Sequence, residues 1–253
     1  AEVNADYEKV RQQHANKKQV PLWPLARARA NRTGVNWAGY QPPVPKFIGR
    51  RVFRNFDLAE LARFIDWGPF FQTWDLAGPF PAILKDAVVG EEAVRVYADG
   101  QRMLKRLVEG RWLTANAVVG FWPAQSVGDD DIALYTDESR QQVAMTWHGL
   151  RQQTEKEAVP GPDGTPVQRP SRCLADFVAP KGVAADCVAV FAVTAGLGVE
   201  KKEQQFVDAH DDYNAILIQA VCDRLAEAFA EYLHEQVRKV HWGYAPDEAL
   251  SNE

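Results

Sequence analysis

The sequence has few cysteines and no long apolar run. Its three cysteines, Cys173, Cys187 and Cys222, are widely spaced among 253 residues and lie in apolar stretches. An odd and scattered set of this kind predicts reduced, buried thiols and no disulfide framework. No stretch approaches the roughly 18 apolar residues of a membrane-spanning helix, and the N-terminal residues are polar where an export signal needs an apolar centre. We therefore expect a cytoplasmic protein that does not span a membrane.

Excess positive charge and the common catalytic motifs are also missing. The formal net charge is -5 at pH 7 and no basic block is interleaved with aromatic residues, so we expect no nucleic-acid partner. The sequence contains no Gly-x-Ser-x-Gly, phosphate-binding loop, His-Glu-x-x-His or Cys-x-x-Cys motif. We therefore expect neither a catalytic nucleophile nor a metal site. A protein that binds and positions a reactive small molecule fits this pattern better.

One stretch dominates what is present, the segment from His210 to Val240. It has no Gly or Pro and repeats apolar residues at helical spacing, which predicts one long amphipathic helix. Acidic residues precede it and basic residues end it, as the helix dipole favours. The predicted buried stripe contains Tyr213, Ile216, Leu217, Ala220, Val221, Leu225, Ala226, Phe229, Leu233 and Val237.

The flank of that stripe carries charge. Asp223 and Glu227 lie one turn apart, where two like charges destabilise an isolated helix by a few tenths of a kcal/mol. Arg224 lies three residues before Glu227, so periodicity alone favours a solvated stripe with internal ion pairs. A ligand contact by Glu227 is the second interpretation.

The N-terminal part is expected to be an arm. Residues 6–18 predict a short polar helix, and a connector rich in Pro, Arg and Asn follows up to Pro45. We expect this arm to bury little and either to wrap the globular part or to be a linker from a preceding domain.

A dense aromatic segment, Ile65 to Gly78, follows a predicted helix at Asp57–Ile65 that Asp57 caps. It contains a single early acid, Asp66, near Trp67 and Phe70. An acid among aromatic residues needs a partner if it is buried, so Asp66 is either a helix cap or a ligand contact. The residues alone do not decide between the two.

The middle of the chain predicts a sheet. A helix is expected at Glu91–Val108, and strands are expected within 114–135 and at 142–146, 173–179 and 187–193. Strands in succession followed by a long helix indicate an α+β fold, with a central antiparallel or mixed twisted sheet packed by long helices. The loop at Asp129–Asp131 is expected to be a solvated turn and His148 a hydrogen-bonded structural residue.

Several motifs, in order, resemble the C-terminal activation domain of cobalamin-dependent methionine synthase. They are IDWGPFFQTWDLAG, VVGFWPAQSVGDDDIALY, LRQQTEK, CLADFVAP and the segment that runs from HDDYNAILIQAVCDRLAEAFAEYLHEQVRKVHWGY to the end. The resemblance covers roughly residues 40–253. It implies an arm or linker at residues 1–45 and a single activation domain at 46–253.

The resemblance implies a function in cofactor repair. Such a domain binds S-adenosylmethionine and serves a cobalamin held by another domain of the same methyltransferase. A flavodoxin or flavoprotein reductase supplies one electron to inactive cob(II)alamin, and the adenosylmethionine methylates the cob(I)alamin that results. The isolated chain is not expected to be active alone.

Matched positions place the ligand-contacting acids of the family on Asp66 and Glu227. Asp223 and Arg224 are assigned to docking against the cobalamin-binding domain. The family continues into an Arg-x-x-x-Gly-Tyr-Pro segment that lies beyond Glu253, so we expect weak adenosylmethionine binding until that segment is added. The alternative function is a non-catalytic docking module for the cobalamin domain or a flavodoxin-type reductase.

Overall fold

The computed structural model describes residues 4, 6–8, 10, 11 and 21–250. Its contacts divide the chain into two compact units. We call them the arm unit, Ala1–Pro42 with Ala124–Asp186, and the helix unit, Pro43–Pro123 with Cys187–Glu253. The predicted polar helix at 6–18 is helical at residues 6–8, 10 and 11, and its remaining positions lie outside the described residues.

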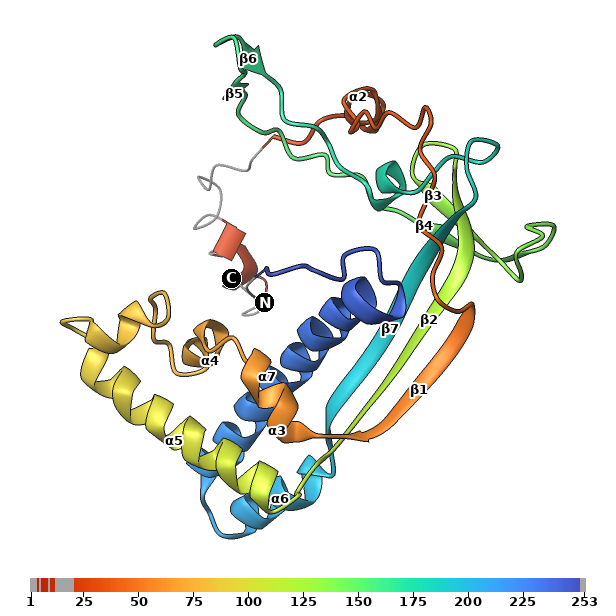
Figure 1. The fold of residues 1–253 in the computed structure, drawn as a ribbon. Coiled ribbons are helices and arrows are strands. Elements are labelled where there is room, and N and C mark those ends of the chain that lie inside the picture. Colours follow the sequence, from red (N-terminus) through yellow and green to blue (C-terminus); the bar gives the residue numbers. More distant parts are fainter. Residues whose placement is uncertain (1–3, 5, 9, 12–20, 251–253) are drawn as a thin grey trace. The chain divides into compact units, whose positions relative to one another are not determined.

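The helix unit is organised around α7, Asp212–Gln236, which is shown in blue in Figure 1. Asp211 caps it by accepting a hydrogen bond from the Asn214 amide, and a π-helical turn at Val237–His241 continues it. This confirms the predicted long helix. Its buried residues include Leu217, Ile218, Ala220, Val221, Cys222, Leu225, Ala228, Phe229, Leu233 and Val237.

One edge of the predicted stripe is wrong. Ile216 is 49% exposed, whereas Ile218 is fully buried and Cys222 is nearly so. Burial raises the pKa of the Cys222 thiol to about 12, because the thiolate would lose its hydration. The buried face therefore widens on the side of Ile218 and Cys222.

Four helices pack against α7 in the helix unit (Figure 1). They are α3 at Leu58–Leu61, α4 at Gly68–Gln72, α5 at Gly90–Glu109 and α6 at Val199–Asp208. The predicted helix at 57–65 is α3 followed by a 3₁₀ turn at Ala62–Phe64, and Asp57 caps it by accepting from the Ala59 amide. The predicted helix at 91–108 is α5. Helix α6 was not predicted.

The sheet has five strands in the order β1-β2-β3-β4, with β7 also paired to β2. The pairs β1–β2, β2–β3 and β3–β4 are antiparallel. This confirms the predicted α+β class. The strands span Gly49–Phe56 (β1), Thr114–Val127 (β2), Asp131–Tyr135 (β3), Val143–His148 (β4) and Asp186–Leu197 (β7).

Two strand predictions differ from the structure. Strand β1 was not predicted, and the strand expected at 173–179 is instead a 3₁₀ turn at Leu174–Phe177. The Asp176 carboxylate accepts a hydrogen bond from the Cys173 amide at 3.0 Å. That bond closes a turn over three residues, which an extended strand cannot do.

The arm unit contains α2 at Leu25–Ala30 and the short strands β5, Val159–Pro160, and β6, Pro166–Val167. The expectation that the arm buries little is wrong at Trp23, which is only 6% exposed. Its amide donates to the Gln153 carbonyl at 2.7 Å, and its own carbonyl accepts from the Gln153 side chain. The proposed boundary at residue 45 stays a prediction.

In the part of the chain that the structure describes, no helix is long and apolar enough to cross a membrane. Within the same residues, no group of three or more His, Cys, Asp or Glu side chains is arranged to hold a metal ion.

Candidate functional site

Asp66 lies between the 3₁₀ turn at Ala62–Phe64 and the start of α4. Its Oδ1 accepts a hydrogen bond from the Gly68 amide at 2.8 Å, and the residue is exposed. This bond closes a turn just before α4, whose N-cap is Trp67 and has no side-chain cap bond, so the interpretation of Asp66 as the N-cap is wrong. Because no other bond to Asp66 is present among the described residues, its second oxygen is open to solvent and a ligand contact stays a prediction.

The aromatic residues after Asp66 belong to the core. Trp67, Phe70 and Phe71 are buried, and Trp67 packs edge to face against Phe70 and Tyr97 with ring centroids 5.1 Å apart in each case. Trp74 contacts Tyr213 of α7 at 5.9 Å. These contacts fix α4 against α5 and α7 and leave the Asp66 carboxylate on the surface.

The same packing explains a glycine inside α5. A Cβ added at Gly100 would lie 2.7 Å from the Phe70 ring and 3.2 Å from the Trp67 ring. Glycine destabilises a helix interior, but here its absent side chain makes room for the two rings that hold α4 in place.

Glu227 extends from the exposed flank of α7 and is held by Arg224. The Arg224 Nη2 donates to Glu227 Oε1 at 2.8 Å, and Nη1 donates to Oε2. The Arg224 side chain is 11% exposed and that of Glu227 62%. The predicted internal ion pair on this flank is confirmed, and Asp223, which is exposed, lies one turn before it.

Asp66 and Glu227 lie on elements that pack together, but the structure does not bring them into contact. Phe64 packs on Tyr232 at 5.3 Å, and Trp74 packs on Tyr213 at 5.9 Å, so the segment between Phe64 and Trp74 runs alongside α7. No hydrogen bond or ion pair joins Asp66 to Glu227 in the described structure.

The charge of this surface is negative. Of the four predicted site residues, Asp66, Asp223 and Glu227 are carboxylates and only Arg224 is basic. Among the described residues, Asp66 and Asp223 have no basic side chain within ion-pair distance. These mainly hydrogen-bond-accepting, negatively charged side chains suit a cationic ligand or a cationic partner surface better than an anion.

Sequence reasoning missed a buried charge cluster in the arm unit. The Arg151 side chain is fully buried and donates to Asp130 Oδ1 at 2.6 Å and to Asp176 Oδ1 at 2.7 Å. It also donates to the carbonyls of Ser171 and Asp129. The turn at 129–131 was expected to be solvated, and this is wrong for Asp130. Arg151 and Asp176 belong to the LRQQTEK and CLADFVAP motifs, which were the only signal in the sequence.

The pKa values of the two acids in the cluster are lowered. Burial by itself raises the pKa of Asp130, but hydrogen bonds from Arg151 and Arg29 outweigh it and hold the pKa below its ordinary value. Asp176 behaves in the same way, with Arg151 and the Cys173 amide as donors. At neutral pH these groups are charged and satisfied, so we assign the cluster a structural role.

His148, which is exposed, places Nδ1 3.1 Å from Asp131 Oδ2, in line with the expected hydrogen-bonded histidine.

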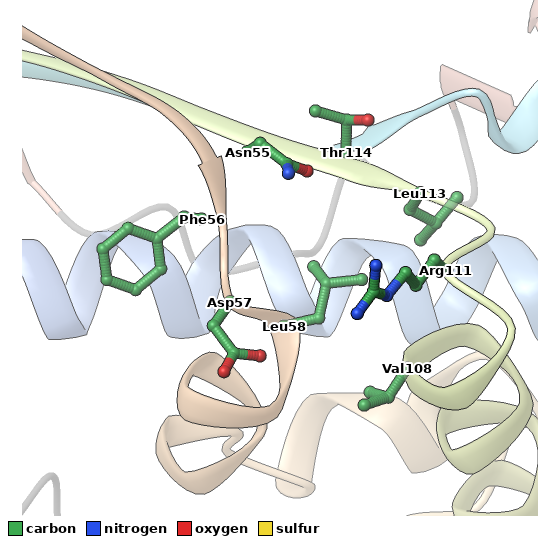
Figure 2. A pocket seen from close by; sticks show the side chains of 8 residues that line it. All are labelled: Asn55, Phe56, Asp57, Leu58, Val108, Arg111, Leu113 and Thr114. Atoms are coloured by element: carbon green, nitrogen blue, oxygen red, sulfur yellow. The ribbon is translucent and has the colours of Figure 1, made fainter.

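A pocket of about 330 Å³ lies elsewhere in the helix unit (Figure 2). Three further pockets are formed around Asp99 and Tyr213, around Lys156 and Arg172, and around Arg32 and Asp176. None of these four pockets includes Asp66 or Glu227. The pocket in Figure 2 is lined by Asn55, Phe56, Asp57, Leu58, Val108, Arg111, Leu113 and Thr114.

Comparison with known proteins places these observations in context. The family model described as "Vitamin B12 dependent methionine synthase, activation domain" matches residues 57–253. A crystal structure described as the MetH reactivation domain bound to AdoHcy matches with a TM-score of 0.79 and 48% sequence identity. The match covers 92% of this chain and 68% of that chain.

Proposed function

Because the chain belongs to the family of activation domains of vitamin B12 dependent methionine synthase, we propose that it binds S-adenosylmethionine and presents it to a cobalamin for reductive reactivation. The structurally similar MetH domain is described as bound to AdoHcy, S-adenosylhomocysteine, which is what adenosylmethionine becomes when it has given up its methyl group. That relationship carries the proposal. Cobalamin, held by its own domain, supplies the nucleophilic cobalt, and the residues of this chain orient the methyl donor.

We propose Asp66 and Glu227 as the ligand-contacting acids. Adenosylmethionine carries a sulfonium and an α-ammonium against one carboxylate, so its net charge is positive. Both proposed acids are exposed, and the Asp66 carboxylate has one oxygen open to solvent. Charge-assisted hydrogen bonds to such a ligand are roughly twice as strong as neutral ones.

Arg224 sets a limit on the contribution of Glu227. Both Glu227 oxygens already accept from the Arg224 guanidinium, so a cationic group of the ligand must share the carboxylate with it. The pair is also partly exposed, where ion pairs typically contribute about 0.2–1 kcal/mol. We therefore expect Asp66 to contribute at least as much binding free energy as Glu227.

The partners follow from the family. We propose that Asp223 and Arg224 contact the cobalamin-binding domain and that a flavodoxin or flavoprotein reductase supplies the electron. The proposed division remains an arm at 1–45 and an activation domain at 46–253. We also propose a cytoplasmic location.

A second candidate is a docking module that does not bind the ligand alone. The engagement of both Glu227 oxygens by Arg224 favours it, as does the position of Asp66 and Glu227 outside the four pockets above. Titration of the chain with adenosylmethionine separates the two. Heat of binding supports the first candidate, whereas no heat together with retained binding to the cobalamin domain supports the second.

The residue assignment is tested by Asp66→Asn and Glu227→Gln. Asn retains the oxygen that accepts from the Gly68 amide, so the first change removes the charge while keeping the turn. We expect each variant to bind adenosylmethionine about 5- to 30-fold more weakly, from roughly 1–2 kcal/mol of lost charge-assisted bonding. Asp75→Asn and Glu231→Gln remove equally exposed carboxylates nearby and serve as controls. Equal losses in the controls would show only a general effect of charge.

A further inference from the structure

The pocket in Figure 2 pairs an acid and a base that do not meet. Asp57 and Arg111 both line it, and the Arg111 guanidinium points into the space beside Leu58. No ion pair joins the two side chains, and among the described residues Arg111 makes no side-chain hydrogen bond. The pocket is therefore bounded by opposite charges that leave room between them.

The remaining lining separates into polar and apolar parts. Asn55 and Thr114 are at the upper edge in Figure 2, and apolar side chains form the rest of the wall. Leu58 and Leu113 are buried, at 7% and 5% exposure, so the apolar wall is continuous with the core of the helix unit. A ligand that fits this lining has two opposite charges at one end and an apolar group at the other.

The backbone supports a specific use of Arg111. Its φ is 48°, in the left-handed region, and Asn55 across the pocket has φ 51°. Arg111 follows the last turn of α5, where Trp112 donates to the Leu107 carbonyl and Arg111 to the Val108 carbonyl. Helices commonly end this way, but glycine is the usual residue at that position. An arginine in this position strains the backbone, but it places a guanidinium at the pocket.

We propose that this pocket binds a free α-amino acid with an apolar side chain. The α-carboxylate binds the Arg111 guanidinium, and the α-ammonium binds the Asp57 oxygen that does not cap α3. The side chain lies against Leu58, Val108 and Leu113. Asp57 keeps one oxygen on the Ala59 amide, at 2.9 Å, which leaves the other for the ligand ammonium in this proposal.

The proposal does not depend on adenosylmethionine binding at Asp66 and Glu227. Adenosylmethionine also has an α-amino-acid end, however, so both molecules carry the chemistry that this pocket recognises. An experiment must therefore separate a site for free amino acids from an extension of the adenosylmethionine site.

The test is titration of the chain with L-leucine, L-phenylalanine and L-methionine, followed by calorimetry and by amide shifts in NMR spectra. Leucinamide lacks the carboxylate and N-acetyl-leucine lacks the ammonium. The affinity of each should therefore be at least about tenfold lower than that of leucine. Arg111→Asn removes the guanidinium with a residue that tolerates the left-handed region, and Asp57→Ser removes the charge but keeps a good helix cap. Both variants should reduce leucine binding by a similar factor.

Two outcomes would overturn the proposal. The first is the absence of saturable shifts at residues 55–58 and 108–114 with any of the three amino acids. The second is a loss of adenosylmethionine affinity in Arg111→Asn and Asp57→Ser equal to their loss of leucine affinity, because the pocket would then be part of the adenosylmethionine site. Unchanged leucine binding in Asp66→Asn and Glu227→Gln is expected. If those two variants also leave the affinity for adenosylmethionine unchanged, the result counts against the proposed function and not against this pocket.

Discussion

Arg151→Met should destabilise the arm unit severely. The wild-type guanidinium is fully buried and bonds two carboxylates and two carbonyls. Methionine fills a similar volume but leaves Asp130 and Asp176 without their central cation. Breaking a buried charge pair by removing one partner typically costs about 3–5 kcal/mol. At roughly 2–4 °C per kcal/mol for a chain of this size, the midpoint of thermal unfolding should fall by about 6–20 °C.

The pH dependence of the stability lost in Arg151→Met identifies the cause of that loss. In the wild type both acids have a pKa below the unfolded value of about 3.9, so their stabilisation is present above pH ~4 and is lost as pH falls through the folded pKa. In Arg151→Met only Arg29 at Asp130 and backbone amides at Asp176 remain to offset burial, so we expect the folded pKa of these acids to rise above the unfolded value. Protonation of Asp130 and Asp176 then removes the uncompensated buried charges. The loss of unfolding free energy relative to the wild type should therefore be smaller at pH 4 than at pH 7.

The assay is denaturant unfolding by circular dichroism at several pH values. Arg29→Met is the matched control, because Arg29 also binds Asp130, at 2.7 Å, but its side chain is 42% exposed. That variant should lose less than about 1 kcal/mol. A deficit in Arg151→Met that is small, or that does not depend on pH, would refute the account of the cluster as a buried ionic support.

Two further predictions concern packing. Phe229→Ala should destabilise the helix unit by about 3–5 kcal/mol, because this fully buried ring packs on Phe56 at 5.0 Å, while Ile216→Ala on the exposed side should change stability by less than about 0.5 kcal/mol. Equal melting temperatures for these two variants would contradict the assigned face of α7. Gly100→Ala should destabilise the helix unit by about 1–3 kcal/mol despite the better helix propensity of alanine, because the added Cβ would overlap the Phe70 ring. A gain of stability in chemical unfolding would contradict that contact.

Helical periodicity predicted the long elements well. Helices α5 and α7 each bury a wide stripe, so a 3.6-residue repeat and charged termini locate them from the sequence alone. The error at Ile216 arises because Ile216 and Ile218 are both apolar and lie on opposite edges of the stripe. Which edge is covered depends on the neighbouring helices, and the period does not contain that information.

The missed strand and the mistaken strand have different causes. Strand β1 reads GRRVFRNF, and only part of it is half-buried, so its pattern does not alternate as a strand is expected to do. Residues 173–179 form a short apolar run, which suits either a strand or a buried turn. Long-range pairing of Arg151 with Asp176 selects the turn, and no local pattern predicts it.

The candidate site was predictable only in part. The Arg224–Glu227 pair follows from the spacing of the two residues, whereas Asp66 closes a turn ahead of α4 and is not its N-cap. Their role as ligand contacts comes from resemblance to a family and remains a prediction. The pocket of Asp57 and Arg111 joins residues more than fifty positions apart, so only the folded chain reveals it.

In the proposed site, exposed carboxylates recognise the positive charge of adenosylmethionine. S-adenosylhomocysteine lacks the sulfonium charge but is otherwise nearly identical, so the ratio of the two affinities measures that recognition directly. Calorimetric titration of both ligands should give tighter binding of adenosylmethionine to the parent chain. The ratio should fall in Asp66→Asn and Glu227→Gln and stay constant in Glu231→Gln. An equal ratio in all four proteins would contradict the assignment of the site.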